Sequence, residues 1–199
     1  MAVDIHRAAE ADFPCRFGHF RIFGFEAQDN GKSEELVVLK LGDLSAPGPA
    51  PLVRIHSQCL TGDVFGSLRC DCRSQLEMAL ERIAGEGRGL LVYEAEEGRG
   101  IGLTNKLKAY QLQDAGADTV EANQQLGFDA DLRTYQVAAA VLHHFGIDRV
   151  RLLSNNPDKI RALEQGGIRV EERVPCEAPP TARTKAYLET KRKKLGHLL

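Results

Sequence analysis

Hydrophobic and polar residues alternate along the first third of the chain, which is the pattern of strands with one buried face. The alternation covers residues 17–25, and runs rich in β-forming residues follow at 36–41 and 52–55. Residues 45–51, rich in Pro with one Gly, separate the last two runs and predict a turn-rich connection. We therefore expect a strand-rich N-terminal part over residues 1–50.

The period of the pattern changes after Arg73, where apolar residues recur at helical spacing. Glycines mark the expected helix ends, and Asn156 followed by Pro157 provides a cap and a first helical residue. The predicted helices run from Arg73 to Gly85 or Gly87, from Leu103 to Gly116, from about Leu132 to Phe145, and from Pro157 to Gly166.

Short apolar strands are predicted between these helices, at residues 89–93, 150–153 and 168–174. Strands that alternate with helices favour parallel pairing within an α/β fold. We expect an α/β protein with a mixed sheet, helices packed on it, the strand-rich N-terminal part and a single compact domain.

A Pro-rich loop at residues 177–184 precedes a basic segment, residues 185–199, that is predicted to be helical. We place one domain at residues 1–175, and the loop with its basic helix at residues 176–199. A charged tail is typical of a solvated face or of a partner contact, so no catalytic role is assigned to it.

Charge is nearly balanced over the 199 residues, with 26 Lys and Arg against 28 Asp and Glu. The net charge of −2 gives no reason to expect nucleic acid or membrane binding, so any phosphate site must be a local group of basic residues. No apolar run approaches the roughly 18 residues of a membrane span, and the N-terminus lacks an apolar signal core. We expect a cytoplasmic location.

Three of the five cysteines, Cys59, Cys70 and Cys72, lie close together in the sequence. In a reducing compartment such a cluster is typical of metal ligands or catalytic groups rather than disulfides. Cys15 and Cys176 are expected to be ordinary thiols outside the cluster.

Three thiolates favour a zinc ion with one open coordination position, because catalytic zinc sites keep a position for water and acidify it. The alternative is a structural zinc site that His56 or Asp71 completes.

A glycine-containing loop, residues 96–102, lies between a predicted strand and a predicted helix. Such loops let backbone amides approach a ligand closely. Glu97 is suited to accept hydrogen bonds from the N–H donors of a guanine edge, and Arg99 to bind phosphate. The alternative is an ordinary turn.

Two further groups and one helix face carry polar residues of interest. Asp131 resembles a helix N-cap, and taken alone Arg133 is interpreted as a surface residue. Residues 154–159 stand at a strand end and helix start, where ligands collect in α/β folds, and structural and functional interpretations are both open. Lys106 and Lys108 are expected on a solvated helix face.

Taken together, these segments resemble the GTP cyclohydrolase II family over residues 54–175, and the last nine residues resemble the family's C-terminal end. The motifs are His-Ser-x-Cys-Leu-Thr-Gly-Asp at 56–63, Ser-Leu-Arg-Cys-Asp-Cys at 67–72, Glu-Gly-Arg-Gly-Ile-Gly-Leu at 97–103, Asp-Thr-Val-Glu-Ala-Asn at 118–123, and Leu-Ser-Asn-Asn-Pro-x-Lys at 153–159. Five ordered motifs are far more specific than any one of them.

The resemblance implies a zinc-dependent hydrolysis of GTP, the first step of riboflavin biosynthesis. The products would be 2,5-diamino-6-ribosylamino-4(3H)-pyrimidinone 5′-phosphate, formate and pyrophosphate. It also implies one zinc ion per subunit, magnesium with the triphosphate, and a homodimer.

The resemblance also implies roles for single residues. Cys59, Cys70 and Cys72 would hold zinc, and Tyr110 would lie near the opening imidazole ring. The substrate-binding positions would be Arg54, His56, Ser57, Gln58, Gln75, Glu97, Gly98, Arg99, Thr119, Ser154 and Lys159.

Arg133 matches the family residue proposed as a nucleophile on the α-phosphorus, with Asp131 as its proton acceptor. An arginine stays protonated at neutral pH, so the residue type alone favours charge stabilisation. Both roles stay open at this point.

Three of the positions at which the chain departs from the family pattern are of most interest for substrate handling. Gln58 stands where the family usually has Glu, and Ala95-Glu96 stands where it usually has Arg-Gln. The changes at Gln58 and Glu96 compensate if both side chains face one pocket.

Because of these departures two alternatives stay open: a paralogue that stops at a formamidopyrimidine product or uses another nucleotide, and a non-catalytic zinc- and nucleotide-binding module. The retained Tyr110 favours the complete reaction, because family members that stop early differ at this position.

Overall fold

The computed structural model describes residues 3–29, 31–129, 131–179, 181 and 184–199. The chain forms two compact units, and each is built from three segments. Unit 1 contains Met1–His56, Glu77–Ala95 and Thr134–Cys176, and unit 2 contains Ser57–Leu76, Glu96–Arg133 and Glu177–Leu199.

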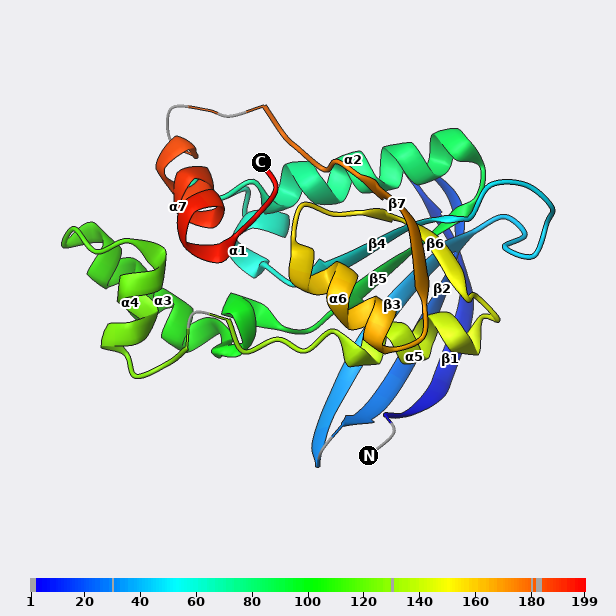
Figure 1. Ribbon diagram of the computed structural model, residues 1–199, viewed down its shortest axis with the longest axis horizontal. Coiled ribbons are helices and arrows are strands. Elements are labelled where there is room, and N and C mark those ends of the chain that lie inside the picture. The colour runs from blue at the N-terminus through cyan, green and yellow to red at the C-terminus, as the bar shows by residue number, and fades with distance from the viewer. Residues whose placement is uncertain (1–2, 30, 130, 180, 182–183) are drawn as a thin grey trace. The chain divides into compact units, whose positions relative to one another are not determined.

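Within the described residues, one seven-stranded sheet has the order β1-β2-β3-β5-β4-β6-β7 (Figure 1). Its first part is antiparallel: β1 (Asp4–Cys15) pairs with β2 (Gly18–Asp29), β2 with β3 (Lys32–Leu41), and β3 with β5 (Gly89–Glu94). β2 shows the predicted alternation, because Phe23, Phe25 and Ala27 are buried and the residues between them are less so.

The other part of the sheet contains the parallel pairs that the strand–helix alternation predicts. β4 (Leu52–Ser57) is parallel to β6 (Arg149–Leu153), and β6 is parallel to β7 (Arg169–Val174). The predicted α/β class, the mixed sheet and the strand-rich N-terminal part are therefore confirmed.

Two helices of unit 1 share one hydrophobic core with the sheet. α5 (Gln136–His144) contributes Val137, Val141 and Leu142, and α6 (Pro157–Gln165) contributes Ala162 and Leu163. The longer helix α2 (Cys72–Glu86) buries a separate apolar stripe that includes Ala79 and Ile83. The Asn156 side chain accepts a hydrogen bond from the Asp158 backbone amide at 2.9 Å, so the predicted cap of α6 is confirmed.

The predicted start of α5 at about Leu132 is wrong, because the helix begins only at Gln136. Tyr135, which precedes it, has a left-handed backbone with φ of 58°, and a right-handed helix does not continue through such a residue. Residues 131–135 are therefore irregular, and Asp131 is not a helix N-cap.

Unit 2 consists of short helices and the turns between them. They are α1 (Leu60–Asp63), the 3₁₀ turn η1 (Glu97–Gly100), α3 (Gly102–Asp114), α4 (Thr119–Gln125) and α7 (Lys185–Leu195). α4 has a capping box in which Asp118 accepts hydrogen bonds from the Val120 and Glu121 amides.

The basic tail forms α7 as predicted, but this helix ends at Leu195 rather than Leu199. Gly196 ends it in a left-handed conformation with φ of 64°. No helix within the described part of the chain combines the length and hydropathy that a membrane span requires. The division into domains of residues 1–175 and 176–199 stays a prediction.

Candidate functional site

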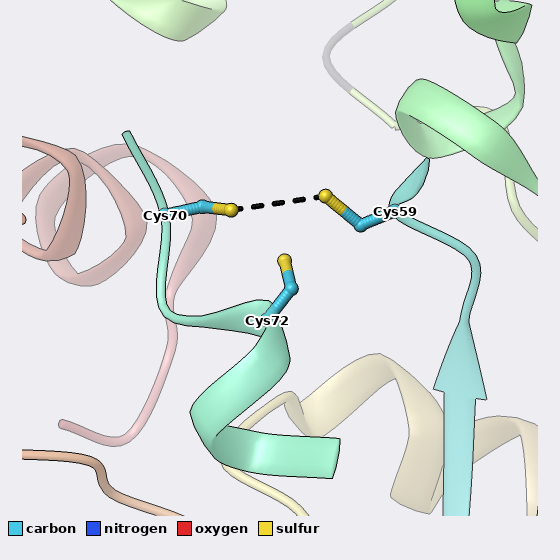
Figure 2. A group of neighbouring side chains, drawn as sticks. All are labelled: Cys59, Cys70 and Cys72. Atoms are coloured by element: carbon cyan, nitrogen blue, oxygen red, sulfur yellow. Dashed lines mark hydrogen bonds between the residues drawn. The ribbon is translucent and has the colours of Figure 1, made fainter. Parts of the chain in front are cut away.

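The three clustered cysteines bring their sulfur atoms together in unit 2 (Figure 2). Cys59 follows β4 at the start of α1, Cys70 lies in the turn before α2, and Cys72 is the first residue of α2. Their Sγ atoms all lie within 4.8 Å of one another, and those of Cys59 and Cys70 are 3.7 Å apart. Tetrahedral zinc with Zn–S bonds of about 2.3 Å separates its sulfur ligands by about 3.8 Å, so this donor set fits zinc.

Gly62 provides the room that this cluster needs. A Cβ atom at this position would lie 2.9 Å from Cys70 Sγ and 3.0 Å from Cys59 Sγ, which is closer than ordinary packing allows. The first turn of α1 can therefore approach the sulfur atoms only because residue 62 has no side chain. This close approach is a second observation that fits a built metal site.

The three thiols share protons. Hydrogen bonds from Cys70 and Cys72 strongly lower the pKa of Cys59, and the charge of Lys106 adds to the effect. The same hydrogen bond with Cys59 raises the pKa of Cys70 to about 11, and the pKa of Cys72 is also raised well above its usual value. A cysteine with a lowered pKa beside two further thiols suits a cation, because metal binding releases the thiol protons.

Lys106 lies beside this cluster, which corrects the prediction that it belongs to a solvated helix face. Its Nζ donates to Glu97 Oε1 at 2.6 Å and to Cys59 Sγ at 3.1 Å, and its side chain is 12% exposed. Burial lowers the pKa of Lys106, but the hydrogen bond to Glu97 and the Cys59 charge raise it above its usual value. Lys108 is exposed, as predicted.

The Glu97 carboxylate accepts three hydrogen bonds from the protein. Its Oε2 accepts from the Leu60 amide at 2.7 Å, and its Oε1 accepts from the Gly98 amide at 2.9 Å and from Lys106. Glu97 therefore ties the glycine-containing loop to the residue that follows Cys59. Its predicted contact with a guanine edge stays a prediction.

Asp131 and Arg133 form a two-pronged ion pair. Arg133 Nε donates to Asp131 Oδ1 at 2.8 Å, and Nη2 donates to Oδ2 at 2.5 Å. Arg133 is mostly buried, so its interpretation as a surface residue is wrong. Burial raises the pKa of Asp131, but the Arg133 hydrogen bonds and charge outweigh it and hold that pKa below its usual value.

Arg99 lies next to this pair, because its carbonyl oxygen accepts from the Leu132 amide at 3.2 Å. Its backbone is left-handed, with φ of 61°, which is rare for a residue with a side chain. Among the described residues its buried Nη1 atom has no hydrogen-bond partner. A donor of this kind is suited to an anionic oxygen.

Tyr110 is linked to the cysteine cluster through Thr61. The Tyr110 hydroxyl lies 3.1 Å from Thr61 Oγ1, which lies 3.7 Å from Cys59 Sγ. The Arg69 guanidinium lies over the ring, 4.8 Å from its centre. Burial raises the pKa of Tyr110, so the phenol keeps its proton at neutral pH.

Four of the predicted substrate residues are buried in unit 1: Arg54 and His56 in β4, Ser154 directly after β6, and Lys159 in the first turn of α6. Arg54 donates to the Leu153 carbonyl at 3.0 Å, and Lys159 donates to the Ile55 carbonyl at 2.8 Å. Ser154 Oγ accepts from the Asn156 amide at 3.1 Å. His56 stacks on Tyr93 with ring centres 5.4 Å apart.

The other predicted substrate residues belong to unit 2: Ser57, Gln58, Gln75, Glu97, Gly98, Arg99 and Thr119. Nucleotide binding by these residues and by those of unit 1 stays a prediction, as does the compensation between Gln58 and Glu96.

Asp71, which lies between Cys70 and Cys72 in the sequence, pairs with Lys191. Sequence reasoning did not predict this pair. The Asp71 carboxylate accepts from Gln75 Nε2 at 2.6 Å and from Lys191 Nζ at 2.9 Å, so protein donors engage both of its oxygens. The prediction that the tail is only a solvated face or partner contact is wrong for Lys191, which is buried. No sequence signal pairs Lys191 with Asp71. For Lys106 a signal exists, because its spacing from Tyr110 places the two residues on one helix face.

Comparison with known proteins agrees with these observations. The family model of GTP cyclohydrolase II matches residues 6–175. The chain is 51% identical to a GTP cyclohydrolase-2 of Shewanella amazonensis over 99% of its own length and 95% of the relative. It is 53% identical to a GTP cyclohydrolase-2 of Hahella chejuensis, over 96% of its length and 91% of the relative.

A longer relative, a riboflavin biosynthesis protein RibBA of Chlorobium phaeovibrioides, is 52% identical over 98% of this chain and 47% of the relative. The chain thus spans about half the length of the RibBA relatives and nearly all of the GTP cyclohydrolase-2 relatives. A family match over most of the chain, together with these identities, shows that the chain belongs to the GTP cyclohydrolase II family.

Proposed function

We propose that this chain hydrolyses GTP to 2,5-diamino-6-ribosylamino-4(3H)-pyrimidinone 5′-phosphate, formate and pyrophosphate, the first step of riboflavin biosynthesis. Its family membership supports the reaction. The observation that carries the proposal is the convergence of three sulfur atoms within 4.8 Å, beside a buried lysine and a buried carboxylate.

Cys59, Cys70 and Cys72 would hold one zinc ion per subunit. When bound, zinc supplies Lewis acidity and lowers the pKa of water, which suits attack on the weakly electrophilic C8 of guanine. Lys106 contributes a positive charge next to Cys59, and Glu97 keeps that lysine in place.

The proposed reaction consumes water at C8 and at the α-phosphorus. One water adds to C8, the C8–N9 bond breaks, and a formamide remains on N7. A second water hydrolyses this formamide and releases formate. A third water cleaves the bond between the α- and β-phosphates and releases pyrophosphate.

Tyr110 is the proposed donor at the opening ring. Its phenol keeps its proton because burial raises its pKa, and Thr61 fixes its direction. A neutral donor at this position stabilises negative charge that develops on the ring during opening. The retained tyrosine supports the complete reaction over arrest at a formamidopyrimidine.

Arg133 is proposed to stabilise the charge that develops at the α-phosphoryl group. Its two hydrogen bonds to Asp131 orient the guanidinium, and an oriented positive charge supports this role over that of a nucleophile. Arg99 Nη1 is proposed to bind another phosphate oxygen. Magnesium would accompany the triphosphate and neutralise part of its charge.

We further propose that the protein works as a homodimer, as the family resemblance implies, and in the cytoplasm, as the hydropathy of the sequence leads us to expect. The altered positions Gln58, Ala95 and Glu96 keep one second candidate open, a paralogue that stops at the formamidopyrimidine or uses another nucleotide.

The experiment is a product assay with GTP, zinc and magnesium in which formate and pyrophosphate are measured separately. The proposal predicts equal amounts of the two, and much less pyrophosphate from Arg133→Ala. Pyrophosphate without formate would support the early-stopping paralogue. No turnover by the metal-loaded protein would support a binding module, and wild-type turnover by Arg133→Ala would refute the role of that residue.

A further inference from the structure

The turn that carries two of the three cysteines also carries a buried acidic residue. Asp71 lies between Cys70 and Cys72, and its side chain is 5% exposed. Gln75, one helical turn further along α2, donates to one oxygen of this carboxylate, at 2.6 Å. The other oxygen accepts from Lys191 Nζ at 2.9 Å.

Lys191 reaches this turn from the tail helix α7, 120 residues away in the sequence. Its side chain is 9% exposed, and its ammonium lies 4.5 Å from the centre of the Tyr187 ring, one turn earlier in the same helix. Burying a charged lysine costs desolvation free energy, so buried lysines are paired with an opposite charge. Here that charge is the Asp71 carboxylate.

A second set of contacts holds α7 in unit 2. Lys194 Nζ donates to Glu121 Oε1 at 2.9 Å and also pairs with Asp118, so it contacts the first turn of α4. Lys193, which lies between Lys191 and Lys194 in the sequence, is exposed, and its Nζ lies 3.6 Å from Glu189 on its own helix. On α7, the Lys191 side chain therefore contacts the turn that contains Cys70 and Cys72, whereas the Lys193 side chain is exposed to solvent.

We propose that Lys191 is a positioning residue for the metal site: through Asp71 it fixes the Cys70–Cys72 turn, so the tail helix is required for tight metal binding. This inference rests on the metal site of the proposed function. The physical reason is that an unpaired buried carboxylate must reach water, and Asp71 cannot do so without moving the two cysteines that flank it. Partners outside the ligand set commonly change metal affinity by about 10–100-fold.

The test measures zinc affinity of metal-free full-length protein by competition with a chromophoric chelator. Cobalt binding, followed by its thiolate charge-transfer absorption, reports the geometry of the three sulfurs independently of activity. Lys191→Met should lower zinc affinity by about 10–100-fold and change the cobalt spectrum. The matched control Lys193→Met removes an exposed lysine from the same helix and should change neither.

A double-mutant cycle of Lys191→Met and Asp71→Asn separates positioning from a general loss of packing. If Lys191 acts through Asp71, the double variant should lose far less affinity than the two single losses multiplied together. Lys191→Arg should recover most of the affinity, because it keeps the charge. If Lys191→Met does not fold, zinc affinity is measured instead on the double variant of Lys191→Met and Asp71→Asn, which has no unpaired carboxylate.

Two results would overturn the inference. The first is a Lys191→Met variant whose zinc affinity and cobalt spectrum equal those of the wild type. The second is a double-mutant cycle in which the effects of Lys191→Met and Asp71→Asn are fully independent. Either result would remove the positioning role of Lys191 and leave the proposed function intact. A wild-type protein that binds neither zinc nor cobalt would instead refute the metal site itself, and with it the proposed function.

Discussion

The Lys106 ammonium lies 3.1 Å from the Cys59 sulfur, inside the group of residues that is proposed to bind zinc. The same Nζ atom donates to the Glu97 carboxylate at 2.6 Å. A positive charge in contact with a ligand sulfur offsets part of the negative charge that three thiolates bring to one ion. Lys106 is thus part of the site although it is not a ligand.

Lys106→Met should lower zinc affinity by about tenfold or more, because it removes this charge and leaves the Glu97 carboxylate buried without its lysine. Lys108→Met is the matched control, since Lys108 lies on the same helix but is exposed. Chelator competition on the metal-free proteins checks the prediction. Equal affinities of the two variants would show that Lys106 has no part in metal binding.

Gly62→Ala should weaken metal binding, because the new Cβ would lie 2.9 Å from Cys70 Sγ and 3.0 Å from Cys59 Sγ. We expect a loss of about tenfold or more in zinc affinity, of the size found for other groups around a metal. Gly85→Ala in α2 meets nothing within 4 Å and should keep wild-type affinity, with stability higher by about 0.5–1 kcal/mol. Unchanged zinc affinity in Gly62→Ala would mean that the sulfur atoms do not need this space.

Cys59→Ser should abolish formate release and spare pyrophosphate release, because only the chemistry at C8 depends on the three sulfur atoms. Separate assays for formate and pyrophosphate check this prediction, and thermal unfolding shows whether the variant folds. Cys15→Ser changes a thiol outside the cluster and should keep both activities. A Cys59→Ser variant that simply unfolds would indicate a structural metal site.

Asp131→Asn should destabilise the protein at pH 7 by about 1–3 kcal/mol, because it leaves the mostly buried Arg133 with a weaker partner. Asp114→Asn breaks the exposed ion pair with Arg69 and should cost only about 0–1 kcal/mol. Urea unfolding measures both differences. Equal effects of the two variants at pH 7 would contradict the importance of the Asp131–Arg133 pair.

The effect of Asp131→Asn should depend on pH in a defined direction. The pKa of Asp131 is lower in the folded protein than its usual value of 3.8, so the unfolded chain binds the proton first as the pH falls. The stabilisation is therefore complete above about pH 4 and is lost at lower pH. The difference between wild type and Asp131→Asn should shrink in that acidic range, and a difference that grows there would contradict the assigned pKa shift.

Local sequence patterns predicted much of the fold and the cysteine cluster. The Asn156 cap is visible because cap and amide are neighbours in the chain, and the short spacing of Cys59, Cys70 and Cys72 predicts that their sulfur atoms lie together, as they do in the structure. β1 was not predicted, because its side chains are mostly exposed and its sequence shows no regular alternation of apolar and polar residues. The late start of α5 follows from the left-handed Tyr135, which no sequence pattern marks.

The residues that sequence reasoning missed depend on contacts between distant segments. Lys191 and Asp71 are 120 residues apart, and Lys106 reaches Cys59 across 47 residues. Read alone, each lysine lies in a charged helical segment and fits a solvated face. Only the tertiary structure shows that both ammonium groups are buried against acidic partners beside the cysteines.

The proposed reaction is tested most directly with GTP that carries ¹³C at C8. Mass spectrometry of the products from the zinc- and magnesium-loaded protein should find all of the label in formate, and an unlabelled pyrimidine that retains one phosphate. A pyrimidine that still carries the labelled formyl group, or GTP that is returned unchanged, would contradict the account.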